Sequence, residues 1–170
     1  MRNASVVLRI HGVDPHAVFE RVHDFARYPD FTDVVRSVTV HEISREEETS
    51  DWEVYFRNGI LRWTEADRFD REALVISFEQ VDGDFEEFSG SWRITADGSD
   101  SLVSFSADFD FGIPSLAGIL DPVAQRVFKE TIARVVFGLF AGAASVVDDE
   151  AVARAVAESA IPSASVAGPR

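Results

Sequence analysis

The hydrophobic pattern of the chain opens with a strand and continues with a helix. Residues 4–11 alternate between apolar and polar side chains, which is typical of a strand with one buried face. Asp14 and Pro15 then form a helix start, and apolar residues recur at helical spacing as far as Phe25. We predict that this helix ends before Tyr28, because a residue followed by proline is disfavoured in the helical conformation.

From residue 34 to residue 111 the chain shows only strand patterns separated by turn signals. The sharpest of these signals is Asn58-Gly59, which favours a two-residue hairpin turn because both residues tolerate positive φ. Strands joined by such short turns pair as antiparallel neighbours. The predicted strands cover residues 34–44, 50–57, 60–69, 73–80, 86–96 and 101–111.

A long helical pattern follows the strands. We interpret residues 112–115 as a linker and Asp121-Pro122 as a helix start, after which apolar residues repeat until Gly142. An amphipathic helix of about 20 residues needs a broad apolar surface, and here only the sheet offers one. Residues 148–158 are expected to form a short helix or an extension of the long one. We divide the chain into a domain over residues 1–145 and a partly disordered extension over 146–170, whose last twelve residues have little to pack.

Length and composition narrow the class of protein. The 170 residues suffice for one domain, and no run approaches the roughly 18 apolar residues of a membrane span. A net charge of −14 argues against nucleic acid and anionic membranes as partners, since both bind clusters of Lys and Arg. The chain has no cysteine, and its four histidines lack metal-ligand spacing. We expect a cytoplasmic protein without metal or cofactor.

Several short motifs accompany this order of elements. They are Val18-Phe19-Glu20-Arg21-Val22 before Tyr28-Pro29-Asp30-Phe31, Trp63 in the fourth strand, Gly83-Asp84-Phe85 before Gly90-Ser91-Trp92, and Phe109-Asp110-Phe111-Gly112-Ile113-Pro114. In these motifs and in its element order the chain resembles the START-like (SRPBCC) superfamily of polyketide cyclases and coenzyme-Q-binding proteins. The resemblance implies an α+β helix-grip fold, in which a curved antiparallel sheet of about seven strands wraps around the long helix and encloses a cavity for a polyketide, quinone or lipid.

The resemblance leaves two functions open. In the aromatase/cyclase branch, acidic and basic groups in the cavity guide cyclisation and dehydration of a polyketide delivered by an acyl carrier protein, as in bacterial antibiotic biosynthesis. The alternative is a non-catalytic carrier that binds or sequesters a lipid, quinone or hydrophobic natural product. An acidic carrier protein would need a local basic patch near Arg21, Arg27 and Arg36. Fold alone does not choose between the two functions.

Two carboxylates are candidates for the chemistry. Side chains alternate along a strand, so Glu65 and Asp67 share a face with Trp63. A carboxyl group in an apolar pocket has a raised pKa, which suits it to proton transfer near neutral pH. We therefore predict Glu65 and Asp67 as catalytic acid–base residues. The alternative is that they lie in solvent or pair with cations of the long helix, which are Arg126, Lys129 and Arg134.

The aromatase/cyclases that this chain resembles carry Trp-x-Ser-x-Arg in the same strand. The matching positions here are Trp63, Glu65 and Asp67, so acids replace both functional residues. Arg68 is displaced by one position and is expected to face outward. A tyrosine of those enzymes, in the loop after the first helix, falls on Val35. The usual cyclase mechanism therefore does not transfer directly to this chain.

Aromatic side chains fall on one phase of the predicted strands. Such residues are usually core, but their number exceeds what a sheet needs beneath one helix, and aromatic walls are typical of sites for flat ligands. We predict that they line the ligand pocket. The predicted ligand-binding residues are Trp52, Phe56, Trp63, Phe78, Phe88, Trp92, Phe105 and Phe109.

Overall fold

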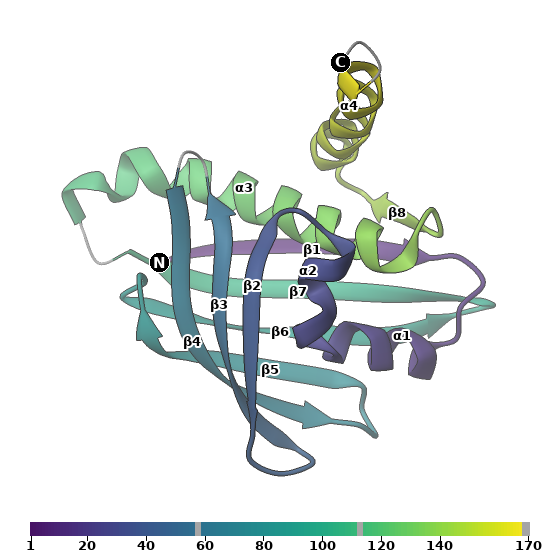
Figure 1. The fold of residues 1–170 in the computed structure, drawn as a ribbon, viewed down its shortest axis with the longest axis horizontal. Coiled ribbons are helices and arrows are strands. Elements are labelled where there is room, and N and C mark those ends of the chain that lie inside the picture. Colours follow the sequence, from purple (N-terminus) through teal and green to yellow (C-terminus); the bar gives the residue numbers. More distant parts are fainter. Residues whose placement is uncertain (57–58, 112–113, 168–170) are drawn as a thin grey trace.

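The computed structural model describes residues 1–56, 59–111 and 114–167, without side chains for residues 114–121 and 159–167 (Figure 1). Within these ranges it contains an eight-stranded antiparallel sheet and four α-helices. The sheet is strongly curved and does not close into a barrel. The predicted helix-grip α+β fold is confirmed.

The sheet is built mainly from the predicted meander. Strands β2 to β7 pair in chain order, and β1 pairs with β7, so the spatial order is β2-β3-β4-β5-β6-β7-β1-β8. The prediction of a turn at Asn58-Gly59 involves residue 58, which lies outside the described residues. The strands are β1 (Arg2–Ile10), β2 (Val35–Glu42), β3 (Glu47–Phe56), β4 (Gly59–Asp70), β5 (Val75–Gly83), β6 (Glu87–Asp97), β7 (Asp100–Asp110) and β8 (Ala144–Val147).

Strand β8 was not predicted from the sequence. It has only four residues and no alternation, and it forms because the chain turns at Gly142, with φ of 90°, and runs back along β1. The domain boundary expected at residue 145 falls inside this strand. Because β8 intervenes, helix α4 (Glu150–Ala167) is a separate helix that projects away from the sheet (Figure 1). Partial disorder of the extension stays a prediction.

The first helical segment agrees with the sequence up to its end. Helix α1 (Pro15–His23) is capped by Asp14, whose carboxylate accepts hydrogen bonds from two backbone N–H groups of the first turn. The expectation that Tyr28 leaves the helical conformation is wrong: after the short 3-10 helix η1 (Phe25–Arg27), Tyr28 has φ −54° and ψ −44° and begins α2 (Tyr28–Phe31). Pro29 is accommodated because it lies in the first helical turn, where its missing N–H has no partner to lose.

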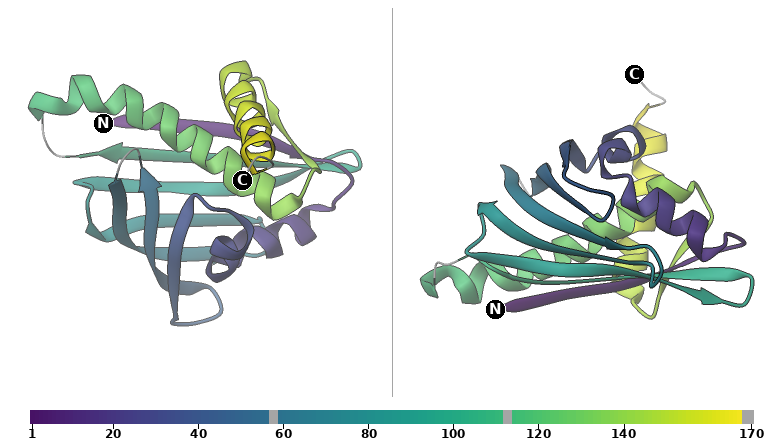
Figure 2. Two further views of the ribbon diagram at one scale, coloured as in Figure 1. Left: turned by 45° about the horizontal axis from the view of Figure 1, so that its top comes forward. Right: turned by 90° about the horizontal axis from the view of Figure 1, so that it is seen from below.

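The long helix begins earlier than predicted. Helix α3 spans Pro114–Phe140, so Pro114 and Ser115 of the expected linker belong to it, while residues 112 and 113 lie outside the described residues. Pro122 is therefore inside the helix and not at its start. An interior proline removes one backbone hydrogen bond, which a helix of this length tolerates. Helix α3 runs across the concave side of the sheet (Figure 2).

Strands β6 and β7 approach each other closely at Gly90, which leaves no space for a side chain there. A Cβ atom on Gly90 would lie 2.1 Å from the backbone oxygen of Ser106 and 2.8 Å from Cζ of Phe78. We expect Gly90→Ala to lower the free energy of unfolding by about 3 kcal/mol, since overpacking here strains backbone as well as side chains. The matched control is Gly59→Ala, where the nearest atom is 3.9 Å away. Equal denaturant midpoints for the two variants would contradict this prediction.

Candidate functional site

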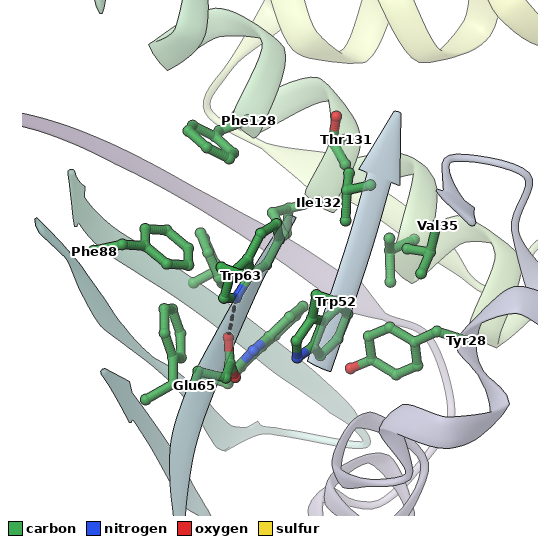
Figure 3. Close-up of a pocket in the computed structure, with 14 residues that line it drawn as sticks. Tyr28, Val35, Trp52, Trp63, Glu65, Phe88, Phe128, Thr131 and Ile132 are labelled. Atoms are coloured by element: carbon green, nitrogen blue, oxygen red, sulfur yellow. Dashed lines mark hydrogen bonds between the residues drawn. The ribbon is translucent and has the colours of Figure 1, made fainter. Parts of the chain in front are cut away.

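The inner face of the sheet and helix α3 enclose a cavity of about 50 Å³. In this structure it has room for only a few water molecules, because one water needs roughly 10–15 Å³. Figure 3 shows side chains from the sheet on one side of this space and those of α3 on the other. The lining residues are Tyr28, Val35, Trp52, Val54, Trp63, Glu65, Phe78, Phe88, Trp92, Phe105, Phe128, Thr131, Ile132 and Val135.

Most of the predicted aromatic residues reach this cavity. Those that line it are Trp52, Trp63, Phe78, Phe88, Trp92 and Phe105. Phe109 is fully buried in the core, and Phe56 packs its ring against Phe111 and Phe128, so the structure does not place these two at the cavity. Trp52 and Trp63 face each other across β3 and β4 with parallel rings 5.8 Å apart. Ligand binding by these residues stays a prediction.

Several lining residues were missed in the sequence. Tyr28 was read only as part of a motif. Of the α3 residues, Ile132 and Val135 were read only as apolar positions of the long helix, and Phe128 and Thr131 were not singled out. Their helical spacing of three and four residues marks one face of α3, so this signal was present. What the spacing could not show is which part of that face lies over the cavity. The position matched to the family tyrosine, Val35, does line it.

A hydrogen-bonded polar network lies in the cavity wall between β3 and β4. The indole N–H of Trp52 donates to Ser50 (2.8 Å), whose hydroxyl donates to Asp67 (2.5 Å). The indole N–H of Trp63 donates to Oε1 of Glu65 (2.7 Å; Figure 3). Strand register produces this arrangement, since Ser50 lies opposite Glu65 and Trp52 lies opposite Trp63. The two predicted acids are thus brought together with both tryptophans.

Burial governs the protonation of the two acids. Glu65 is 3% exposed and Asp67 2% exposed. Burial raises the pKa of Glu65 well above its usual range, and its hydrogen bond to Asp67 and the charge of Asp67 raise the pKa further, while the bond from Trp63 opposes the rise. Burial also raises the pKa of Asp67, against hydrogen bonds from Glu65 and Ser50. The pair therefore holds a proton more firmly than exposed carboxyl groups do.

Glu48 extends the acid pair and was missed in the sequence. It lies directly opposite Asp67 on β3, is 7% exposed, and has its pKa raised to about 7 by burial and then by the charge of Asp67. Glu48 and Asp67 also line a second hollow of about 290 Å³, whereas Glu65 lines the aromatic cavity. Among the three acids, Glu65 therefore borders the aromatic cavity, and Glu48 and Asp67 border the second hollow. The missed signal was the shared phase of Glu48, Ser50 and Trp52 along β3.

Glu65 and Asp67 take neither of the alternative positions considered from the sequence, which were in solvent or beside the cations of the long helix. Glu65 and Asp67 are buried, so neither lies in solvent. The predicted outward orientation of Arg68 is confirmed, since its side chain is exposed and lies 2.8 Å from Glu47. The helix cations approach other acids: Arg126 and Arg134 approach Glu130, and Lys129 approaches Asp149, at 3.6–3.7 Å.

Two further classes of site were sought in the described part of the chain. No group of three or more His, Asp or Glu side chains there is arranged to hold a metal ion, although three acids lie close to one another. None of the helices, over the residues that could be searched, is long and apolar enough to cross a membrane. The candidate site therefore consists of the aromatic cavity and its buried acids.

The family described as "Polyketide cyclase / dehydrase and lipid transport" matches residues 12–136. This match spans most of the chain, and the chain belongs to that family. Membership in it, together with the enclosed apolar cavity, supports a role in binding hydrophobic small molecules. Comparison with curated proteins gives no match.

Solved structures with the same fold come from several organisms. A protein from Thermus thermophilus, TTHA0849, has 22% identity, with a TM-score of 0.75 over 81% of this chain and 94% of that one. The Zhui aromatase/cyclase from Streptomyces sp. R1128 has 22% identity and a TM-score of 0.61 over 79% and 84%. A START superfamily protein from Mycobacterium smegmatis has 15% identity and a TM-score of 0.69 over 81% and 96%. At these identities the likeness establishes the fold alone.

Proposed function

We propose that this protein is a polyketide cyclase/dehydrase that uses Glu65 and Asp67 to move protons on a flat hydrophobic substrate. The observation that carries the proposal is the buried carboxyl pair at the wall of an aromatic cavity. A carboxyl group that keeps its proton near neutral pH is a general acid at the pH of the cell. The family match and the fold shared with an aromatase/cyclase support the same reaction class.

Dehydration of a hydroxylated polyketide illustrates how the pair would act. The proton shared by Glu65 and Asp67 passes to the substrate hydroxyl, the carbon–oxygen bond breaks, and water leaves. The Glu65 carboxylate then takes the proton from the adjacent carbon as the double bond forms, which restores the acid. Only Glu65 lines the cavity, so Asp67 is a positioning residue that holds the proton and the compensating charge behind it.

The narrow cavity makes side-chain movement part of the proposal. Small-molecule sites usually enclose about 300–1,000 Å³, and this cavity has about 50 Å³. A substrate would therefore displace aromatic side chains such as Phe128, which reaches the cavity from α3 and packs against Phe88 of the sheet. Binding should accordingly change the fluorescence of Trp52, Trp63 and Trp92, all of which line the cavity.

The second candidate function is a non-catalytic carrier of a quinone, lipid or hydrophobic natural product. It is favoured by the replacement of Trp-x-Ser-x-Arg with Trp63, Glu65 and Asp67. An acyl carrier protein is not part of either proposal, because the expected basic residues are engaged elsewhere. Arg27 pairs with Asp30, Arg36 lies 3.7 Å from Glu53, and Arg21 donates to the carbonyl of Leu139.

The double variant Glu65→Gln/Asp67→Asn separates the two functions. Under the enzyme proposal it should bind a polyketide thioester but lose at least about a hundredfold in product formation, since acid–base groups contribute that much or more. Chromatography of the products measures the rate, and quenching of tryptophan fluorescence measures binding. Glu87→Gln is the control, because it removes a charge from the exposed side of β6. Undiminished turnover in the double variant would favour the carrier.

A further inference from the structure

A second group of reactive side chains lies at the edge of the sheet where β1, β7 and β8 meet. His11 directly follows β1, Asp100 begins β7, and Ser145 lies in β8. Strand β8 runs along β1 with Ser145 opposite Arg9, and the backbone N–H of His11 donates to the carbonyl of Ala143 (2.8 Å). The residues that line the aromatic cavity include none of these. Arg9, His11, Asp100 and Ser145 are called the Ser145 cluster below.

The serine and the histidine of this cluster are in direct contact. The hydroxyl oxygen of Ser145 lies 3.0 Å from Nε2 of His11. A neutral imidazole has one acceptor nitrogen and one N–H donor, so when Nε2 accepts the hydroxyl proton of Ser145, Nδ1 carries the hydrogen. Nδ1 lies 3.8 Å from Oδ2 of Asp100. The order hydroxyl, imidazole, carboxylate is the arrangement that activates a serine as a nucleophile.

The backbone holds Asp100 beside the imidazole. Its Oδ1 accepts a hydrogen bond from the N–H of Gly12 (2.9 Å), the residue after His11. Gly12 has φ of 70°, in the left-handed region that glycine adopts readily. The 3.8 Å from Asp100 to Nδ1 is longer than a hydrogen bond, and such contacts are often long before substrate binds and shorten in the complex. Asp100 is therefore a positioning residue for His11.

Arg9 places a positive charge beside the serine. Because Arg9 lies directly opposite Ser145, the two side chains are neighbours on one face of the sheet. One guanidinium nitrogen of Arg9 donates to Asp97 and lies 3.7 Å from Oδ2 of Asp100. A guanidinium has five N–H donors, so others are left for a ligand. A cation at this position stabilises the oxyanion that forms when a serine attacks an acyl group.

From this geometry we propose that the Ser145 cluster is a second reactive site, which hydrolyses carboxylic esters. The oxygen of Ser145 attacks the ester carbonyl carbon as its proton passes to Nε2 of His11, and the oxyanion forms beside Arg9. The bond between the carbonyl carbon and the alcohol oxygen then breaks, and the alcohol leaves with the proton from His11. Water attacks the acyl-serine and gives a proton to His11, which returns it to the oxygen of Ser145 as the acid leaves.

The surroundings of the cluster define the class of ester. The side chain of His11 is 52% exposed, so a substrate reaches it directly from solvent and is held by few contacts. Asp97 and Asp100 lie beside the reacting groups and disfavour an anionic substrate. The substrate class is therefore a small uncharged ester. This site is separate from the aromatic cavity, so the inference does not rest on the proposed function, and either can fail without the other.

Labelling and turnover of the wild-type protein test the inference first. A fluorophosphonate should form a bond between its phosphorus and the oxygen of Ser145 as fluoride leaves, and mass spectrometry of proteolytic peptides locates this label. The protein should also hydrolyse p-nitrophenyl acetate, and Ser145→Ala should lose at least about tenfold of that rate. Ser5→Ala is the control, because it removes an exposed hydroxyl of β1 that is hydrogen-bonded to Asn3 and Ser106; it should keep both the label and the rate.

Two further variants separate chemistry from structural support. His11→Ala should lose the hydrolysis, and added imidazole should restore part of it, which a misfolded protein would not allow. Asp100→Asn should lower kcat about tenfold and leave KM unchanged, since it removes the partner of the imidazole and no contact to substrate. Labelling of Ser145 no faster than that of Ser5, or equal hydrolysis by wild type and Ser145→Ala, would overturn the inference. So would a rate in His11→Ala equal to that of the wild type.

Discussion

Raising the pH from about 5 to about 8 should lower the free energy of unfolding of this protein. The pKa of Glu48 is about 7 in the folded state against an ordinary value of 4.5, so the folded protein binds more protons than the unfolded one between these values, and stability falls as pH rises. Glu48 contributes its full share to the free energy of unfolding below the pKa that it has in the unfolded chain. That share is lost as the pH rises through its folded-state pKa. Allowing for solvent screening, we expect about 2 kcal/mol. Glu65 and Asp67 act in the same direction, since burial raises the pKa of each.

Urea denaturation at a series of pH values measures this effect. Glu48→Gln should flatten the dependence and make the protein more stable than the wild type at about pH 8, while Glu87→Gln on the exposed side of β6 should leave the slope unchanged. Hydrogen bonds from Thr64 and Arg62 lower the pKa of Asp51 and Glu53, respectively. Asp51 and Glu53 therefore stabilise the folded protein above their ordinary pKa values, and this stabilisation is lost only as the pH falls below the range of about 5 to 8. Identical slopes for Glu48→Gln and the wild type would show that Glu48 titrates normally.

Trp63→Ala should destabilise the protein more than any single change in the acid network. Trp63 stacks on Trp52 and meets the rings of Phe85 and Phe88 edge to face at 5.8 and 5.3 Å. Its indole N–H also holds Glu65. Removing a buried tryptophan side chain leaves a large void, and we expect a loss of about 4 kcal/mol in the free energy of unfolding. The hydrogen bond lost with it lowers the pKa of Glu65 in the wild type, so the pKa of Glu65 should rise further.

Trp63→Phe separates the ring from its hydrogen bond. Phenylalanine keeps an aromatic ring against Trp52 but has no N–H, so Trp63→Phe should lose less than half the stability that Trp63→Ala loses. Both variants should raise the pKa of Glu65, which carbon NMR of the labelled carboxyl group would follow across pH. If the two variants lose equal stability, the bond to Glu65, and not the ring stack, holds this wall of the cavity.

Strand phase was the part of the site that the sequence predicted well. Side chains alternate along any strand, so the inward face shared by Trp63, Glu65 and Asp67 follows from position alone, and the burial of β4 confirms it. The helix ends were predicted less well, because Pro29 and Pro122 were taken as boundaries. Proline is compatible with a first turn and, at the loss of one hydrogen bond, with a helix interior, so neither residue fixes a boundary by itself.

The sequence by itself determined the order of elements and the inward phase of the acids and tryptophans, because these depend on local periodicity. The curved sheet around the long helix was implied by the family resemblance. Only the tertiary structure decided which strands lie opposite one another, and so which groups meet. The β3–β4 register places Glu48 beside Asp67 and Ser50 beside Glu65. The tertiary structure also decided how α3 packs over the sheet, which leaves Phe109 in the core and makes the cavity narrow. Register and packing join residues distant in sequence, and no local pattern encodes those distances.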